Sequence, residues 1–112
     1  MANKYGAIKT NGYSSKREAK RAAELKLLAL AGQIDRLQEQ VVFELAPSVV
    51  VQGRKRPPLR YIADFTYQEL HFANNTLTRV FIVEDVKGMR TDVYRVKRHL
   101  MKSVHGIDIL ET

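Results

Sequence analysis

Two acidic residues and one lysine in the C-terminal half have the spacing of a hydrolytic metal site. Asp64 lies in the apolar segment YIADFTY, and Asp85 and Lys87 close the apolar segment VFIVEDVK. Because side chains alternate between the two faces of a strand, Asp85 and Lys87 are expected on one face and Glu84 on the other. An acid at the end of a buried strand is usually paired, protonated or bound to a metal, because an isolated buried charge is costly.

Converging carboxylates from Asp64 and Asp85 would suit Mg²⁺, which takes oxygen ligands and keeps several of its waters. Lys87 could then orient or deprotonate a water for attack on a phosphodiester, while the metal stabilises the developing negative charge. The same residues also allow a structural interpretation. In that interpretation Asp85 and Lys87 form a surface ion pair, and Asp64 pairs with Arg60 or Arg79.

The first element that must position these residues is a helix. Ser15 followed by Glu18 has the form of a capping box, and the segment 18–31 is rich in helix-forming residues until Gly32 ends it. Helical spacing predicts a buried face on this helix. Ala23, Leu27, Leu30 and Ile34 recur at that spacing. Leu25 and Leu28 make the second half of the helix apolar nearly all round, so the helix is expected to pack on a sheet.

Three strands are expected to follow the helix. β-Branched residues over 41–51, interrupted by Pro47, indicate an edge or bent strand, and the segment QGRKRPP after it is read as a loop. Residues 59–68 and 78–87 are the second and third strands, joined by a loop with the turn-prone pair Asn74 and Asn75.

A second helix is predicted from the N-cap Thr91 to about residue 104, closed by Gly106 and followed by a short strand over 107–110. Its inward residues would be Val93, Val96, Leu100 and Val104. The order of helix, three strands, helix and strand predicts an α/β fold with a mixed sheet flanked by helices.

Length and composition favour a small, self-contained protein with a polyanionic partner. The 112 residues suffice for one compact domain, expected over 14–112 after a mobile basic arm over 1–13. The net charge of +7 and the pI of about 9.9 favour nucleic acid. Without cysteine there is no disulfide and no thiolate nucleophile. With no long apolar run and no secretory signal, a cytoplasmic location without membrane contact is expected.

The order of elements and acids resembles the PD-(D/E)XK nuclease superfamily, whose core runs αβββαβ with one acid on the second strand and (D/E)XK on the third. Asp64 and the tripeptide Asp85, Val86 and Lys87 carry the match, although Ala63 replaces the proline of the superfamily's name. The segments NKYGA, SSKREAKRAAELKLL, YIADFTY and VEDVKGMRTDVYRVKRHL are similar to a family of small phage-borne proteins described as recombination endonucleases.

The resemblance implies a DNA endonuclease that depends on Mg²⁺, with Mn²⁺ as a substitute, and that resembles archaeal-type Holliday-junction resolvases in layout. Branched recombination intermediates would be its substrates, and a two-fold homodimer would suit the cutting of two strands. In such resolvases a glutamate of the first helix joins the metal ligands, and Glu18 occupies the matching position, although its capping role alone would explain it. Glu84 is kept as a lesser metal-ligand candidate beside Asp85.

Seven basic residues are expected to hold DNA phosphates without reading bases. They are Arg54, Lys55, Arg56, Arg95, Lys97, Arg98 and Lys102. One alternative function is a non-catalytic basic DNA-binding accessory protein. Another is a ribosomal type of RNA-binding protein, which is disfavoured because three neighbouring acids would repel phosphate unless a cation intervenes. The sequence leaves the choice between DNA and RNA open.

Overall fold

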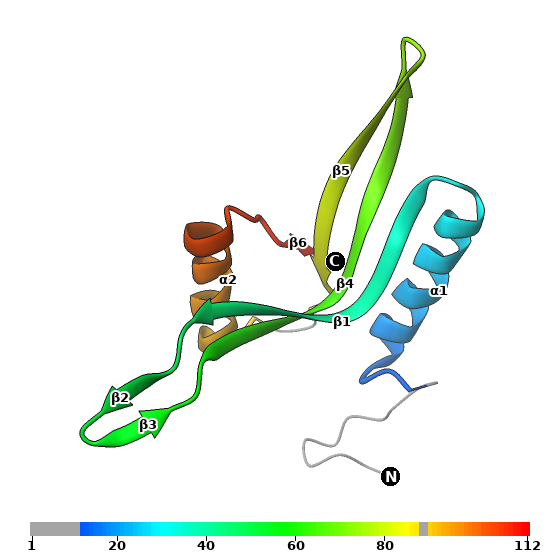
Figure 1. The fold of residues 1–112 in the computed structure, drawn as a ribbon. Helices are drawn as coiled ribbons and strands as arrows, with labels where there is room; N and C mark the ends of the chain where they lie inside the picture. Colours follow the sequence, from blue (N-terminus) through cyan, green and yellow to red (C-terminus); the bar gives the residue numbers. More distant parts are fainter. Residues whose placement is uncertain (1–11, 88–89) are drawn as a thin grey trace. The chain divides into compact units, whose positions relative to one another are not determined.

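The computed structural model describes residues 12–87 and 90–112, so most of the predicted N-terminal arm lies outside the described residues. The chain forms two compact units. One contains the described residues up to Leu37 together with Tyr67–Ile82, and the other contains Gln38–Thr66 and Val83–Thr112. The protein is of mixed α/β class, as predicted, and its main sheet has the strand order β1-β4-β5-β6 (Figure 1).

Helix α1 (Lys16–Leu30) begins and ends where the sequence predicts. The Ser15 hydroxyl accepts a hydrogen bond from the Glu18 amide, and Gly32 follows the helix with a φ of 75°. The row of apolar residues at helical spacing is not the buried face of the helix, because Leu27 and Leu30 are 66% and 86% exposed. A face rotated around the helix is buried instead. It consists of Glu18, Ala22 and Leu25.

Three long strands supply most of the main sheet and pass through both units. They are β1 (Ile34–Ala46), β4 (Leu59–Ala73) and β5 (Thr76–Asp85). Ile34 starts β1 and does not belong to the preceding helix, which corrects the prediction. Asn74 and Asn75 both have positive φ and join β4 to β5 in two residues, as in a tight antiparallel hairpin. The last strand, β6 (Leu110–Glu111), pairs with β5 in parallel, so the sheet is mixed.

Part of the segment expected as a basic loop, 54–56, is a strand, and it pairs with 49–51, the end of the first expected strand, in a second, two-stranded sheet. Strands β2 (Val49–Val51) and β3 (Arg54–Arg56) pair antiparallel around Gln52 and Gly53, whose φ angles are 51° and 76°. We call these two strands with their turn the β2–β3 ribbon. All residues of the ribbon are exposed, so no buried face marks it in the sequence.

Helix α2 (Asp92–His105) packs on strands of its own unit. Thr91 caps it by accepting a hydrogen bond from the Tyr94 amide, and Gly106 ends it in the left-handed conformation, both as predicted. Its predicted inward valines are instead exposed, and Tyr94 and Met101 are buried. The core around them also contains Leu45, Tyr61, Ala63 and Val83. No helix in the described part of the chain is long and apolar enough to cross a membrane.

Candidate functional site

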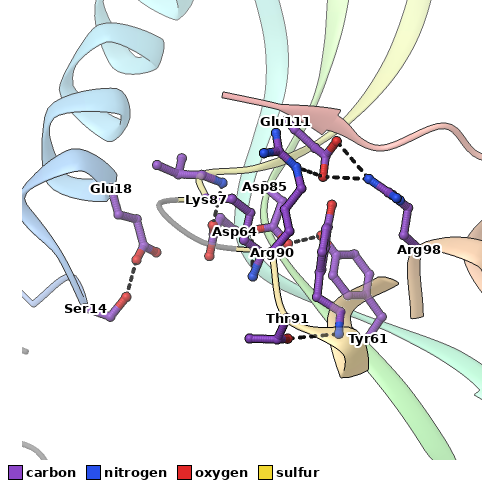
Figure 2. A network of polar contacts seen from close by, with 12 residues as sticks. Ser14, Glu18, Tyr61, Asp64, Asp85, Lys87, Arg90, Thr91, Arg98 and Glu111 are labelled. Carbon is purple, nitrogen blue, oxygen red and sulfur yellow. Dashed lines mark hydrogen bonds and ion pairs between the residues drawn. The ribbon is translucent and has the colours of Figure 1, made fainter. Parts of the chain in front are cut away.

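Asp85 is a buried carboxylate held by two side chains. It ends β5 with 2% of its surface exposed, and its Oδ2 accepts a hydrogen bond of 2.5 Å from the Tyr61 hydroxyl. Its Oδ1 lies 3.3 Å from Lys87 Nζ (Figure 2). The predicted shared face of Asp85 and Lys87 is therefore confirmed. The pair is not the surface ion pair of the structural interpretation, because the Asp85 carboxylate is withdrawn from solvent.

Asp64 reaches the chain just after Asp85. Asp64 is half-buried on β4, and its Oδ2 accepts a hydrogen bond of 2.8 Å from the Val86 amide. Arg79 lies 3.5 Å from the Asp35 carboxylate, and the pairing of Asp64 with Arg60 or Arg79 stays a prediction. The predicted approach of the Asp64 carboxylate to the end of β5 is thus present in the structure.

Both acids affect the pKa of the Tyr61 hydroxyl. The pKa of Tyr61 is raised far above its usual value. Burial has the largest effect, followed by the hydrogen bond and charge of Asp85, then by Tyr94 and last by the charge of Asp64. Tyr61 therefore stays protonated in the folded protein and donates to Asp85 at every ordinary pH. The Tyr61 side chain is buried and belongs to the core around α2.

Lys87 stands between the acids and a small cavity. Its Nζ lies 4.5 Å from the centre of the Tyr94 ring, close enough for a cation–π contact, and its side chain is about one-quarter exposed. The cavity has a volume of about 260 Å³. Lys87 lines it together with Tyr61, Ile62, Thr91, Val93, Tyr94 and Lys97. Two ammonium groups and a threonine hydroxyl can therefore meet an anionic group there.

The other two predicted ligands have partners of their own. Glu84 is fully buried, and its Oε2 accepts a hydrogen bond of 3.0 Å from the Thr112 hydroxyl. Glu18 belongs to the unit that contains α1, where the Ser14 hydroxyl donates to its Oε2 at 2.5 Å. The metal-binding roles of Glu18 and Glu84 stay predictions. Within residues 12–87 and 90–112, no three acidic or histidine side chains form a metal-binding group.

Glu111 was missed by sequence reasoning although it stands directly across from Asp85 in the β5–β6 register. Arg90 Nε lies 2.8 Å from Glu111 Oε2, and Arg98 lies 3.3 Å from both carboxylate oxygens (Figure 2). Burial alone would raise the pKa of Glu111, but the Tyr94 hydroxyl and the two arginines outweigh burial and lower it. This network fixes the edge of the sheet beside Asp85.

Within the part of the chain that the structure describes, the buried Tyr94 hydroxyl has no well-formed hydrogen bond, although the Glu111 carboxylate still acts on it. Burial first, and then the interaction with Glu111, raise the pKa of Tyr94. Neither Glu111 nor this role of Tyr94 is visible in the sequence, because β6 has only two residues and carries no periodic signal.

Six of the seven basic residues predicted to bind DNA fall into two classes, and the seventh, Lys97, lines the cavity beside Lys87. On α2, Arg95, Arg98 and Lys102 each pair with an acid, Asp92, Glu111 and Asp108 respectively. These pairs reduce the positive charge that α2 offers to a phosphate. The side chains of Arg54, Lys55 and Arg56 are exposed and form no ion pair within the described residues.

Comparison with known proteins gives one match. No curated protein and no solved structure is similar to the chain. Residues 2–107 match a family model described as protein of unknown function (DUF1064). Because this match covers nearly all of the 112 residues, the chain belongs to the DUF1064 family.

Proposed function

We propose that the protein is a Mg²⁺-dependent endonuclease of the PD-(D/E)XK type that hydrolyses phosphodiester bonds in branched DNA. The observation that carries the proposal is the buried Asp85 carboxylate, which touches Lys87 while Asp64 of the adjacent strand binds the next amide. Burying an acid in this way is costly. A site that must hold a cation gives a reason for that cost.

The order of elements supports the same proposal. If the β2–β3 ribbon is treated as an insertion between β1 and β4, the remaining elements run helix, three strands, helix and strand. This is the order of the PD-(D/E)XK core. Asp64 then lies on the second core strand and Asp85 at the end of the third, which are the positions that the superfamily uses.

The donor set fits a hard cation. Each carboxylate oxygen has two lone pairs, so a carboxylate oxygen that accepts a hydrogen bond can still coordinate a cation. Two carboxylates and several waters are a common ligand set for Mg²⁺, and Mn²⁺ accepts the same oxygen ligands. When bound, Mg²⁺ supplies positive charge that stabilises the charge developing on the phosphate.

The chain's own residues have three tasks in this proposal. Tyr61 holds one oxygen of Asp85 and so orients the carboxylate. Lys87 Nζ hydrogen-bonds the attacking water and stabilises negative charge on the phosphate oxygens. The cavity beside Lys87, with Lys97 on its wall, receives the phosphate to be cut. The oxygen of a water molecule bonds to phosphorus and the water releases one proton to the solvent, while the bond from phosphorus to the leaving oxygen breaks and that oxygen takes up one proton from the solvent.

A panel of DNA substrates tests the proposal. Purified protein is incubated with duplex, single-stranded, flap and four-way DNA in Mg²⁺, in Mn²⁺ and in EDTA. We expect cleavage of branched DNA in either metal and none in EDTA. If none of these DNAs is cut in either metal, the nuclease proposal is wrong.

A non-catalytic, basic DNA-binding accessory protein is the second candidate. The ion pair between Asp85 and Lys87 favours it, because the pair already neutralises the acid without a metal. This candidate predicts binding to the same DNA panel without cleavage, so the panel separates the two functions.

A further inference from the structure

The β2–β3 ribbon is exposed on both sides and has no place in the core of its unit. Its valines, Val49, Val50 and Val51, are 51%, 69% and 47% exposed. An isolated two-stranded hairpin is only marginally stable in water, and exposed valines add nothing to its stability. Such a ribbon gains from contact with a partner.

Prolines separate the ribbon from the main sheet at both of its ends. Pro47 stands between β1 and β2, and Pro57 and Pro58 stand between β3 and β4. Because proline has no amide proton, it cannot continue a ladder of hydrogen bonds. The ribbon accordingly forms a sheet of its own (Figure 1).

All the charge of the ribbon is positive and lies on one strand. The segment 47–58 contains three basic residues, Arg54, Lys55 and Arg56, and no acid. In the register of the ribbon Arg54 faces Val51 and Arg56 faces Val49, so the two arginines share one side and Lys55 occupies the other. Successive residues of a strand advance by about 3.3 Å, so the two arginines lie about 6.6 Å apart along β3, with Lys55 between them on the opposite side.

We propose that the β2–β3 ribbon enters the major groove of B-form DNA, with the cations of β3 on the phosphates that border the groove. The major groove is about 12 Å wide and accepts a two-stranded β-ribbon, whereas that of A-form RNA is too narrow for side chains to read. The absence of acids along 47–58 makes phosphate the complementary partner. The inference rests on the proposed function, because it names how that nuclease holds duplex arms.

The salt dependence of DNA binding measures how many phosphates the cations of the protein contact. Each phosphate contact contributes about 0.9 to the slope of log affinity against log salt, so three contacts contribute about 2.7. A fourfold rise in salt should then weaken the wild type about 40-fold more than a variant without these contacts. The ribbon variant replaces Arg54, Lys55 and Arg56 with glutamine. The control variant makes the same change at three exposed basic residues of the other unit, Lys16, Lys20 and Arg36.

Binding to a labelled duplex is followed by fluorescence anisotropy in EDTA, so that no cleavage intervenes. We expect the ribbon variant to lose about 2.7 of the slope and the control variant to keep nearly all of it. A ribbon variant that keeps the wild-type slope, or loses no more than the control, overturns the inference. Equal melting temperatures of the three proteins establish that the variants are folded.

Two further comparisons test the groove itself. Methyl green, which occupies the major groove, should displace the wild type from DNA, and netropsin, which occupies the minor groove, should not. The ribbon variant and the wild type should bind an RNA duplex of the same sequence equally. If netropsin alone displaces the protein, or if the ribbon variant loses as much affinity for the RNA duplex as it loses for DNA, the ribbon does not enter the major groove. If binding depends on the ribbon but the protein cuts no DNA, the nuclease proposal is wrong and the ribbon inference stands. If the protein cuts DNA but its binding does not depend on the ribbon, only the ribbon inference is wrong.

Discussion

Replacing Tyr61 with phenylalanine tests whether the hydroxyl holds Asp85 in place. The substitution keeps the ring, which packs in the core around α2, and removes the donor of the 2.5 Å hydrogen bond to Asp85 Oδ2. Both side chains are almost fully buried, so water cannot replace the lost donor without opening the core. We therefore expect the loss to appear both in stability and in cleavage.

The size of the effect follows from the charge and burial of Asp85. A hydrogen bond to a charged group contributes about 1.5–3 kcal/mol, and for a domain of this size 1 kcal/mol corresponds to roughly 4 °C in melting temperature. We expect the melting temperature of Tyr61→Phe to fall by about 8 °C. Because residues that orient a metal ligand commonly affect activity by about 10–100-fold, cleavage should slow by a factor in that range.

Tyr13→Phe is the matched control, because the Tyr13 hydroxyl also has a side-chain partner, Lys26 Nζ at 3.0 Å, but at an exposed position. Exposed pairs stabilise little, so its melting temperature should hardly change. Thermal unfolding followed by circular dichroism compares the three proteins. If Tyr61→Phe melts no lower than Tyr13→Phe, the hydroxyl does not hold Asp85 and the argument for a prepared carboxylate is wrong.

Two predictions concern protons at the sheet edge beside Asp85. The pKa of Glu111 is lowered in the folded protein, so its ionised form stabilises the fold above the usual value of 4.5, and this stability is lost as pH falls through the folded pKa. Urea unfolding of Glu111→Gln and the wild type should therefore differ most near neutral pH and converge in acid, and a difference that does not vary with pH would contradict the lowered pKa. The pKa of Tyr94 is raised, so one pH unit above the usual tyrosine value of 10.0 the folded Tyr94→Phe variant should show the same tyrosinate absorbance at about 295 nm as the wild type. A smaller signal in the variant would mean that Tyr94 ionises normally.

Local signals in the sequence were sufficient for the ends of both helices, and they were insufficient for the buried faces. Ser15 and Thr91 cap the helices through contacts within three residues, which any sequence pattern can reveal. Apolar residues surround much of α1, so spacing alone could not choose between Leu27, which is exposed, and Leu25, which is fully buried. Packing partners that are distant in sequence decide between such faces.

The sequence patterns misassigned β3 to a loop and Ile34 to the first helix. The β2–β3 ribbon has no buried face, so its residues do not alternate between apolar and polar. Ile34 continues the helical spacing of α1 although Gly32 has already ended that helix. The glycine therefore predicts the end of the helix better than the spacing of apolar residues does.

Part of the candidate site could also be predicted. Strand alternation placed Asp85 with Lys87 correctly because the relation spans two residues. The Tyr61–Asp85 bond joins residues 24 positions apart, and Glu111 meets Asp85 through the β5–β6 register. Both contacts depend on strand pairing, which a single sequence does not encode locally.

The central claim is that Asp64 and Asp85 together hold the cation that cleavage requires. Its most direct test is the single-turnover rate of four-way DNA cleavage in Mg²⁺ by Asp64→Asn and Asp85→Asn. Asp108→Asn is the control, because Asp108 is an exposed acid paired with Lys102. Loss of a metal ligand removes several kcal/mol of transition-state stabilisation, so we expect rates to fall roughly 10³-fold for both site variants and to stay at the wild-type level for the control. Cleavage by Asp64→Asn or Asp85→Asn at the rate of the control would contradict the account.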